Sequence, residues 1–256
     1  MNKRISMMYP ARILFISLSL LWLAGCSTTP EQKEPEIPAL HSVEDNVDPN
    51  VNYVVDIFDP WEPMNRRIYN FNTQFDRYIF LPVVRGYEFI TPTVVQKSVS
   101  NFFFNINEIE YFINSVLQLK PEPAFTAAWR FAMNTTFGVF GLFDPATTLM
   151  DTPRWEEDFG QTLGHWGVGD GPFIVLPFLG PSNARDTTGL IGDAVMFSAL
   201  DPLNFEKNDL EVPYFVSKSI DNRHRVKFRY WESGSPFEYE LVRLLYTEYR
   251  KLEIAK

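Results

Sequence analysis

The chain has 256 residues, of which 45% are hydrophobic and 16% aromatic. This composition excludes intrinsic disorder for most of its length, because disordered chains lack the apolar surface that offsets ordering entropy. Its formal charge of -9 argues against binding DNA, RNA or an anionic surface through bulk charge. A single cysteine excludes a disulfide framework and a cysteine-based zinc site.

Residues 1–25 are predicted to be a signal peptide. Basic residues precede the apolar run 13–24, which is too short to span a bilayer comfortably. The run ends in Leu23-Ala-Gly-Cys26, which resembles a bacterial lipobox and implies cleavage between Gly25 and Cys26, with lipid on the cysteine thiol. The alternative is a buried helix that ends at a cysteine by chance. Cleavage would also remove Lys3, Arg4 and Arg12. The remaining chain has 20 basic and 32 acidic residues, a formal charge of -12.

The segment after the lipobox is predicted to anchor and tether the protein. Acyl chains on Cys26 would hold it in a membrane, since each buried CH₂ contributes about 0.8 kcal/mol. Inner-membrane retention in many bacteria depends on Asp at the next position, and Ser27 stands there. The resemblance therefore implies the cell outer membrane, with the protein lipid-anchored on the periplasmic side. Residues 26–55 are acidic and rich in Pro, Ser and Thr, which predicts a flexible tether.

Residues 56–256 are predicted to form one helical domain. In Asp59-Pro60-Trp61-Glu62, Asp59 is expected to cap a helix and Pro60 to take its first position. Pro82 is expected to end that helix. Its apolar stripe recurs at the helical spacing of 4, 3, 4, 3, at Met64, Ile68, Phe71, Phe75 and Tyr78.

Three further helices complete an all-α prediction. One follows Thr91-Pro92 and carries apolar residues at helical spacing from 95 to 116. Asparagines at 101, 105 and 107 leave open whether it breaks near Asn105. Another is expected from about Ala124 to Thr136. The motif Ser235-Pro-Phe-Glu238 repeats the capping pattern and opens the last helix.

Glycine gathers in two aromatic-rich segments, 137–145 and 159–181. Because glycine supplies positive φ angles and close backbone approach, these segments are expected to form an irregular, apolar loop region rich in Gly, Pro and aromatic residues. Such backbone is tolerated at membrane depth where it lines a cavity. An ordinary loop between helices explains the composition equally well, and composition alone does not decide between them.

Motifs for catalysis and metal binding are not found in the sequence. The three histidines, at 41, 165 and 224, have no metal-ligand spacing, and neither G-x-S-x-G nor H-E-x-x-H occurs. We therefore expect no catalytic residues, no metal, no cofactor and no enzymatic activity. The basic run 223–229 is most often a solvated helix face. The alternative is that it meets phosphate headgroups or an acidic partner.

Together the motifs resemble the VacJ/MlaA family of outer-membrane lipoproteins. They follow the lipobox in the family's order and span about residues 56 to 190, beyond which the match thins. The residues that carry the resemblance are Asp59-Pro-Trp-Glu-Pro-Met-Asn-Arg66, Tyr69-Asn-Phe-Asn72, Gly138-Val-Phe-Gly-Leu-Phe-Asp144, Phe159-Gly-Gln-Thr-Leu-Gly-His-Trp-Gly-Val-Gly-Asp-Gly-Pro172, Leu176-Pro-Phe178, Gly180, Ser182 and Arg185-Asp186.

The resemblance implies a ring-like helical protein embedded in one leaflet of the outer membrane, with an amphipathic channel. Such a protein removes mislocalised phospholipids from the outer leaflet, which maintains lipid asymmetry, and passes them to a soluble periplasmic lipid carrier. Trimeric porins are the expected partners, and nucleic acid is not. The rivals are a structural or assembly lipoprotein that binds porins and a lipid-anchored phospholipid hydrolase.

A lipid path or hinge is expected around Gly138, Gly141, Phe143 and Asp144. Two glycines within four residues permit backbone conformations that other residues adopt only at a cost, and the phenylalanines could face acyl chains. The alternative is that Gly138 merely caps the preceding helix in a left-handed conformation.

Overall fold

The computed structural model describes residues 57–256. The predicted signal peptide, the lipidation and cleavage site at Gly25 and Cys26, and the tether lie outside the described residues. The rest is predominantly helical with one two-stranded sheet. Its elements are α3 (Glu62–Phe75), the π-helical turn η1 (Asp76–Phe80), α4 (Leu81–Ile90), α5 (Thr93–Leu117), α6 (Pro121–Thr136), α7 (Pro145–Thr148), α8 (Phe159–His165), β1 (Phe173–Leu176), β2 (Gly180–Asn183), α9 (Ala184–Leu200), α10 (Phe205–Asn208), α11 (Glu211–Arg225) and α12 (Glu238–Ala255).

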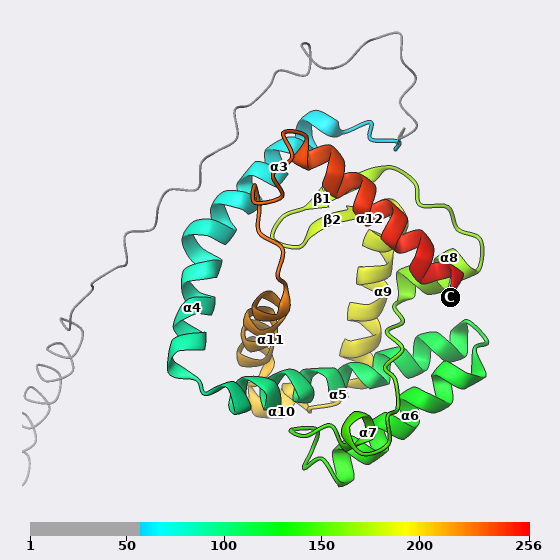
Figure 1. Ribbon diagram of the computed structural model, residues 1–256. Coiled ribbons are helices and arrows are strands. Elements are labelled where there is room, and N and C mark those ends of the chain that lie inside the picture. Colours follow the sequence, from blue (N-terminus) through cyan, green and yellow to red (C-terminus); the bar gives the residue numbers. More distant parts are fainter. Residues whose placement is uncertain (1–56) are drawn as a thin grey trace, which may run out of the picture. The chain divides into compact units, whose positions relative to one another are not determined.

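The helices of this domain follow one another around a frame instead of packing as a bundle (Figure 1). The helices α3 and α4 form one side, α5 forms the base with α6 against it, and α9 rises on the opposite side. The helix α11 lies within the frame against α4 and α5, while α12 packs against α8 and β2. The predicted ring-like helical arrangement is therefore present.

The expected helix end at Pro82 is wrong. The chain passes from α3 through η1 directly into α4, which continues to Ile90. In the π turn, the Leu81 amide donates to the carbonyl of Asp76, five residues back. Pro82 thus lies in the first turn of α4, directly after the π turn, whose shifted hydrogen-bond register accommodates a residue that lacks an N–H.

The two predicted capping motifs are also wrong, because their side chains bind other elements. The helix α3 starts at Glu62 without a side-chain cap, and the Asp59 carboxylate instead accepts hydrogen bonds from Asn65 and from Tyr239 and Arg243 of α12. The helix α12 likewise lacks a side-chain cap. Each motif marks a helix start within two or three residues, but its carboxylate joins segments distant in sequence.

The helix α5 runs unbroken past Asn105. Asn105 is buried, and its Nδ2 donates to the Thr135 hydroxyl of α6 at 2.9 Å. The asparagine therefore joins two helices and does not break one.

The helix α6 starts at Pro121, three residues before the predicted start, since both of its prolines fit in the first turn.

The glycine-rich segment 159–181 is more regular than predicted. It contains α8 and, with the residues up to 183, an antiparallel hairpin in which Phe173 pairs with Asn183 and Leu176 with Gly180. Asn65 of α3 accepts from the Val175 amide at 2.9 Å and donates to the Phe173 carbonyl at 3.0 Å. The prediction of an irregular loop fails here, because these long-range hydrogen bonds stabilise strands too short to show a sequence pattern.

The apolar core is divided between two small clusters. Tyr69, Phe173, Val175 and Tyr239 join α3, the hairpin and α12. A second cluster, centred on Phe103 of α5, joins that helix to α9 and α11. Helices on a frame cannot all reach one centre, so other interactions must hold them together.

Candidate functional site

Buried ion pairs connect α5, α6 and α7. The fully buried Arg130 donates from Nε to Glu108 at 2.6 Å and from Nη2 to Asp144 at 3.0 Å. Asp144, one of the predicted site residues, also caps α7 by accepting from the Thr147 amide at 3.0 Å. Burial opposes its ionisation, but hydrogen bonds from Thr147 and the charge of Arg130 hold the pKa of Asp144 below its usual range.

A second ion-paired cluster holds α12 in place. Arg250 of α12 binds Asp158, the N-cap of α8, at 2.7 and 2.8 Å. Its Nε also donates to Asp186 of α9 at 2.8 Å. The pKa of Asp186 is lowered, because bonds from Arg250 and Tyr246 and the nearby arginine charges outweigh its burial. One guanidinium therefore joins three helices.

The basic run 223–229 is not simply a solvated helix face. Arg223 pairs with Asp76 of η1, His224 with Glu88 of α4, and Arg225 with Asp221. The first two pairs fasten α11 to the adjoining side of the frame. The prediction of a solvated face is thus wrong for Arg223, which is buried.

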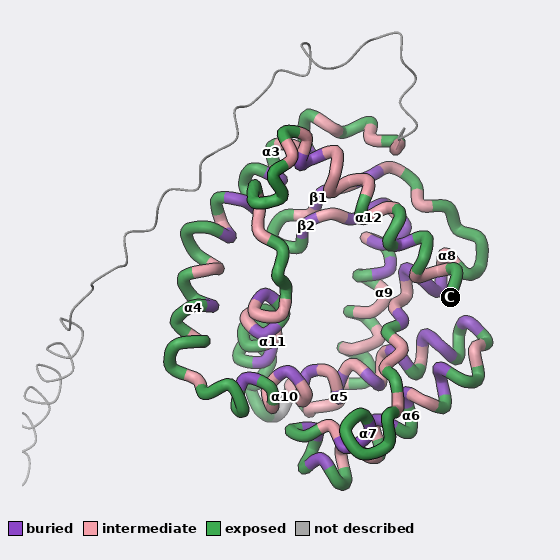
Figure 2. Tube along the Cα trace, viewed as in Figure 1, coloured by how far each residue is buried: buried purple, intermediate pink, exposed green. Residues whose placement is uncertain are grey.

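The distribution of polar and apolar side chains is the reverse of an ordinary soluble core. Among the described residues, 24 polar or charged side chains are buried against 12 hydrophobic ones, so the interior is largely polar. Many large apolar side chains are exposed, and exposed positions recur all around the frame (Figure 2). Exposed apolar surface on this scale marks a protein, membrane or ligand interaction site. It includes Ile79, Phe89, Ile90 and Val94 around α4, Phe125, Phe137 and Phe140 around α6, and Ile191 and Val195 on α9.

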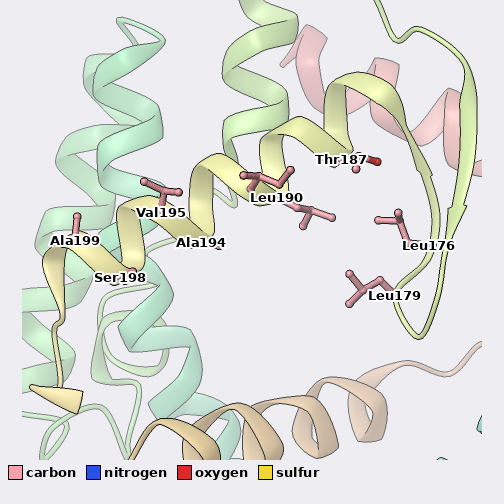
Figure 3. Close-up of a pocket in the computed structure, with 9 residues that line it drawn as sticks. Leu176, Leu179, Thr187, Leu190, Ala194, Val195, Ser198 and Ala199 are labelled. Atoms are coloured by element: carbon pink, nitrogen blue, oxygen red, sulfur yellow. The ribbon is translucent and has the colours of Figure 1, made fainter. Parts of the chain in front are cut away.

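One open apolar pocket, of about 620 Å³, lies along α9 beside the hairpin. Leu176 and Leu179 project from the hairpin toward α9 (Figure 3). The other lining residues are Thr187, Leu190, Ile191, Ala194, Val195, Ser198 and Ala199. This pocket was not among the sites predicted from the sequence. The α9 residues recur at i, i+3, i+4, i+7 and i+8, which is the spacing of one helical face. This spacing is the sequence signal that could have indicated the pocket.

The predicted hinge segment is a tight turn after α6. Gly138 does not have a positive φ, whereas Val139, Phe140 and Gly141 have φ of 54, 56 and 86°. The alternative that Gly138 is a left-handed helix cap is therefore wrong. The Phe143 side chain is 55% exposed, and its amide donates to the Gly138 carbonyl at 2.9 Å. Whether the segment moves, or borders a lipid, stays a prediction.

The described part of the chain contains neither a membrane-spanning helix nor a candidate metal site. No helix between residues 57 and 256 combines the length and apolar character needed to cross a membrane. Within the same residues, no three or more His, Cys, Asp or Glu side chains gather as a possible metal site.

The frame, its buried ion pairs and its apolar exterior define a class of helical protein suited to contact with apolar ligands or surfaces. The chain belongs to the MlaA lipoprotein family, whose model matches residues 57–253. It is 38% identical over 179 residues to an uncharacterised protein of Rickettsia conorii, covering 69% of each chain.

Two further comparisons concern relatives with a described role. The chain is 38% identical over 140 residues to the intermembrane phospholipid transport system lipoprotein MlaA of Escherichia coli, covering 53% of this chain and 55% of that protein. A solved structure from work on the maintenance of bacterial outer membrane lipid asymmetry superimposes with a TM-score of 0.65 at 30% identity, covering 77% of this chain and 98% of the other.

Proposed function

We propose that this protein is an outer-membrane lipoprotein that removes mislocalised phospholipids from the outer leaflet and passes them to a periplasmic carrier for retrograde transport. It thereby maintains the lipid asymmetry of the outer membrane. Family membership and the relatives named for phospholipid transport support this function. The observation that carries it is the combination of an ion-paired polar interior with an apolar exterior and an open apolar pocket.

The ion pairs let the frame remain folded without a large apolar core. Carboxylate–guanidinium pairs such as Arg130 with Glu108 and Arg250 with Asp186 join helices directly. The apolar side chains are then free to face acyl chains, as expected of a body embedded in one leaflet. Each CH₂ of an acyl chain that enters the pocket gains about 0.8 kcal/mol relative to water.

The transfer of an intact lipid needs binding and release, with no bond made or broken. The protein accordingly acts as a transport component and not as an enzyme. Acyl chains on Cys26 hold it on the periplasmic side of the outer membrane, residues 26–55 act as the tether, and residues 56–256 form the transport domain. Its partners are the outer-membrane bilayer, trimeric porins and a soluble lipid carrier.

The test is a deletion strain complemented with matched variants. Outer-leaflet phospholipid should rise on deletion and fall with the wild-type gene. Val195→Asn places an amide in the pocket and should fail to restore asymmetry. Leu200→Asn changes an exposed residue of the same helix that does not line the pocket, and it should restore asymmetry. Protein abundance is measured in each strain.

Other outcomes identify the rival functions. Unchanged outer-leaflet phospholipid together with reduced porin levels would replace the transport proposal with an assembly role. Release of fatty acid or headgroup from phospholipid vesicles by the purified protein would replace it with a hydrolase.

A further inference from the structure

The tip of the β1–β2 hairpin, residues 177–179, joins two apolar surfaces. The ring of Phe178 packs against the rings of Phe71 and Phe75 of α3, with centroid distances of 5.3 and 4.7 Å. The next residue, Leu179, lines the α9 pocket (Figure 3). Phe178 remains 57% exposed and Leu179 71% exposed, so apolar surface continues over the tip from the pocket to α3.

Asn72 of α3 holds this tip in place. Its side chain accepts from the Phe178 amide at 2.8 Å and donates to the Leu176 carbonyl at 2.9 Å. Phe178 has a φ of 66°, a left-handed conformation that a residue other than glycine adopts only at a cost. Such strain persists where the surroundings impose it, and it gathers at functional sites. The contacts with α3 therefore keep an exposed aromatic ring at the tip.

Beyond the tip, the apolar surface continues along α3, η1 and α4. Its residues, which we call the α3–α4 stripe, are Phe71, Phe75, Ile79 and Val83. Phe75 is half-buried, and the other three are exposed. Steps of four residues drift by about 40° each around a regular α-helix. The π turn holds more residues per turn, which offsets the drift and keeps the four side chains on one side.

The charged residues of this segment lie off the stripe. Asp76 is buried in its ion pair with Arg223. Arg77 is two residues before Ile79, and two residues correspond to about 200° around a helix, so its side chain lies on the opposite side. The stripe therefore offers hydrocarbon contacts and carries no charge.

The stripe has the length of an acyl chain. Phe71 and Val83 are twelve residues apart, which corresponds to about 18 Å along the helix axis at 1.5 Å per residue. The acyl chains of one leaflet extend about 15 Å, half of the hydrocarbon core of a bilayer. An acyl chain that starts at the hairpin tip can therefore lie along the stripe.

We propose that a diacyl phospholipid straddles the hairpin tip, with one acyl chain in the α9 pocket and the other along the α3–α4 stripe. The proposal rests on the proposed function and assigns the binding mode of its substrate. The glycerol backbone crosses the tip at Phe178, whose ring separates the two chains. The two apolar surfaces, joined at the tip, thus match the two chains of one lipid.

This arrangement explains how an open helix face can hold a chain. A chain on the stripe alone stays partly in water and binds weakly, whereas the concave pocket covers more of it. Once one chain occupies the pocket, the other is held beside the stripe, and its binding costs no further translational freedom. The stripe therefore favours lipids that have a second chain over lipids that have one.

The test compares photoactivatable phosphatidylethanolamine with its lyso form, which has one acyl chain. Every chain carries a diazirine near its end, and the purified mature protein is labelled in detergent micelles. Mass spectrometry then identifies the labelled peptides. The diacyl lipid should label both α9 and residues 71–83, and the lyso form should label α9 while leaving residues 71–83 nearly unlabelled. Equal labelling of residues 71–83 by the two forms would overturn the proposal.

Three matched variants separate the two surfaces. Ile79→Asn places an amide on the stripe and should reduce labelling of residues 71–83 by the diacyl lipid about tenfold, with labelling by the lyso form unchanged. Val195→Asn changes the pocket and should reduce labelling by both lipids. Leu252→Asn changes an exposed leucine of α12 outside both surfaces and should alter neither. Equal losses of both lipids in Ile79→Asn would contradict a stripe that holds only the second chain.

Phe178→Gly tests the tip itself. Glycine adopts the left-handed conformation without strain, so the hairpin should keep its fold, but the apolar surface no longer continues across the tip. Labelling of residues 71–83 by the diacyl lipid should fall toward the level of the lyso form. Labelling as strong as in the wild type would show that the lipid does not cross the tip at Phe178.

The failure of this binding mode and the failure of the proposed function give different results. If the diacyl lipid labels α9 of the wild type but not residues 71–83, the straddling arrangement is wrong and transport stands. If neither lipid labels the wild type, the proposed function itself fails. Circular dichroism of each variant confirms that it has folded.

Discussion

Arg223 of α11 and Asp76 of the π turn form a two-bonded ion pair, with Nε–Oδ1 and Nη2–Oδ2 distances of 2.6 and 2.7 Å. The same guanidinium donates to the carbonyls of Val226 and Phe228. One side chain thus joins α11, the π turn between α3 and α4, and the segment that leads toward α12. The planar fork of arginine allows this geometry, which lysine cannot reproduce.

We predict that Arg223→Met lowers the free energy of unfolding by about 3 kcal/mol, because it leaves the Asp76 carboxylate buried without its partner. Arg223→Lys keeps the charge and should recover only part of that loss. Urea denaturation followed by circular dichroism gives both values. The double variant Arg223→Met, Asp76→Asn should be less destabilised than the sum of the single changes. Strict additivity would show that the pair does not couple these segments.

The sequence predicts local features of this fold far better than it predicts the interactions between distant segments. Helix starts near Glu62, Thr93 and Glu238 follow from proline and apolar periodicity. The roles of Asp59 and Glu238 do not, because a carboxylate that caps a helix and one that binds a residue some 170 positions away look alike in sequence.

The candidate functional site shows the same contrast between local features, which the sequence predicts, and contacts between distant segments, which it does not. Asp144 was predicted, from a family motif, to border a lipid path or hinge; it lies in an ion pair with Arg130, and its role in transport stays a prediction. The α9 pocket was missed, because its other wall, Leu176 and Leu179, comes from the hairpin, whose position beside α9 depends on the closure of the frame. Periodicity describes one helix at a time and carries no information on that closure.

The two glycines after α6 should resist substitution on steric grounds. A Cβ at Gly138 would collide with the carbonyl oxygens of Asn134 and Phe143, and one at Gly141 would lie 2.5 Å from the Asn105 Cβ. We predict that each alanine variant loses about 1–3 kcal/mol of stability. Gly86→Ala in α4, where an added Cβ meets nothing within 4 Å, should instead gain about 0.5–1 kcal/mol. Thermal unfolding compares the three, and a neutral Gly138→Ala would contradict the packing.

A test of the predicted hinge at residues 138–144 needs a substitution that makes the turn more flexible without a steric collision. Val139 is β-branched and has a φ of 54°, a conformation that costs about 1–2 kcal/mol for a non-glycine residue. Val139→Gly should therefore leave stability unchanged or raise it. If the turn moves during transport, the same variant should alter outer-leaflet phospholipid at normal protein abundance. Normal lipid asymmetry in a fully folded variant would eliminate the hinge.

The anchor at Cys26 has a direct test. We predict that Cys26→Ala no longer incorporates a fatty-acid analogue and is lost from the outer-membrane fraction. Ser27→Ala changes the neighbouring residue and should keep both properties. A Cys26→Ala protein that still carries label and still fractionates with the outer membrane would show that the lipobox assignment is wrong.

The pKa of Glu110 of α5, which burial and the charge of Asp193 raise, also predicts how stability depends on pH. In the folded protein the pKa of Glu110 is about 8, against an ordinary value of 4.5. Between these values the folded state retains a proton that the unfolded chain releases. The stabilising contribution is therefore complete below pH 4.5 and is lost as the pH rises toward 8, with a slope of at most about 1.4 kcal/mol per pH unit.

The measurement compares wild type with Glu110→Gln by urea unfolding between pH 6 and pH 8. The neighbouring titratable groups are Asp158, Asp193, Lys218 and Tyr214, and they remain in both proteins. Asp193, with a pKa of about 6, is half ionised at pH 6 and almost fully ionised at pH 8, and it titrates in both proteins. Because partial exposure screens Glu110, the observed slope should fall below the limit. Wild type should lose stability relative to the variant as the pH rises, and parallel curves would mean that Glu110 ionises normally.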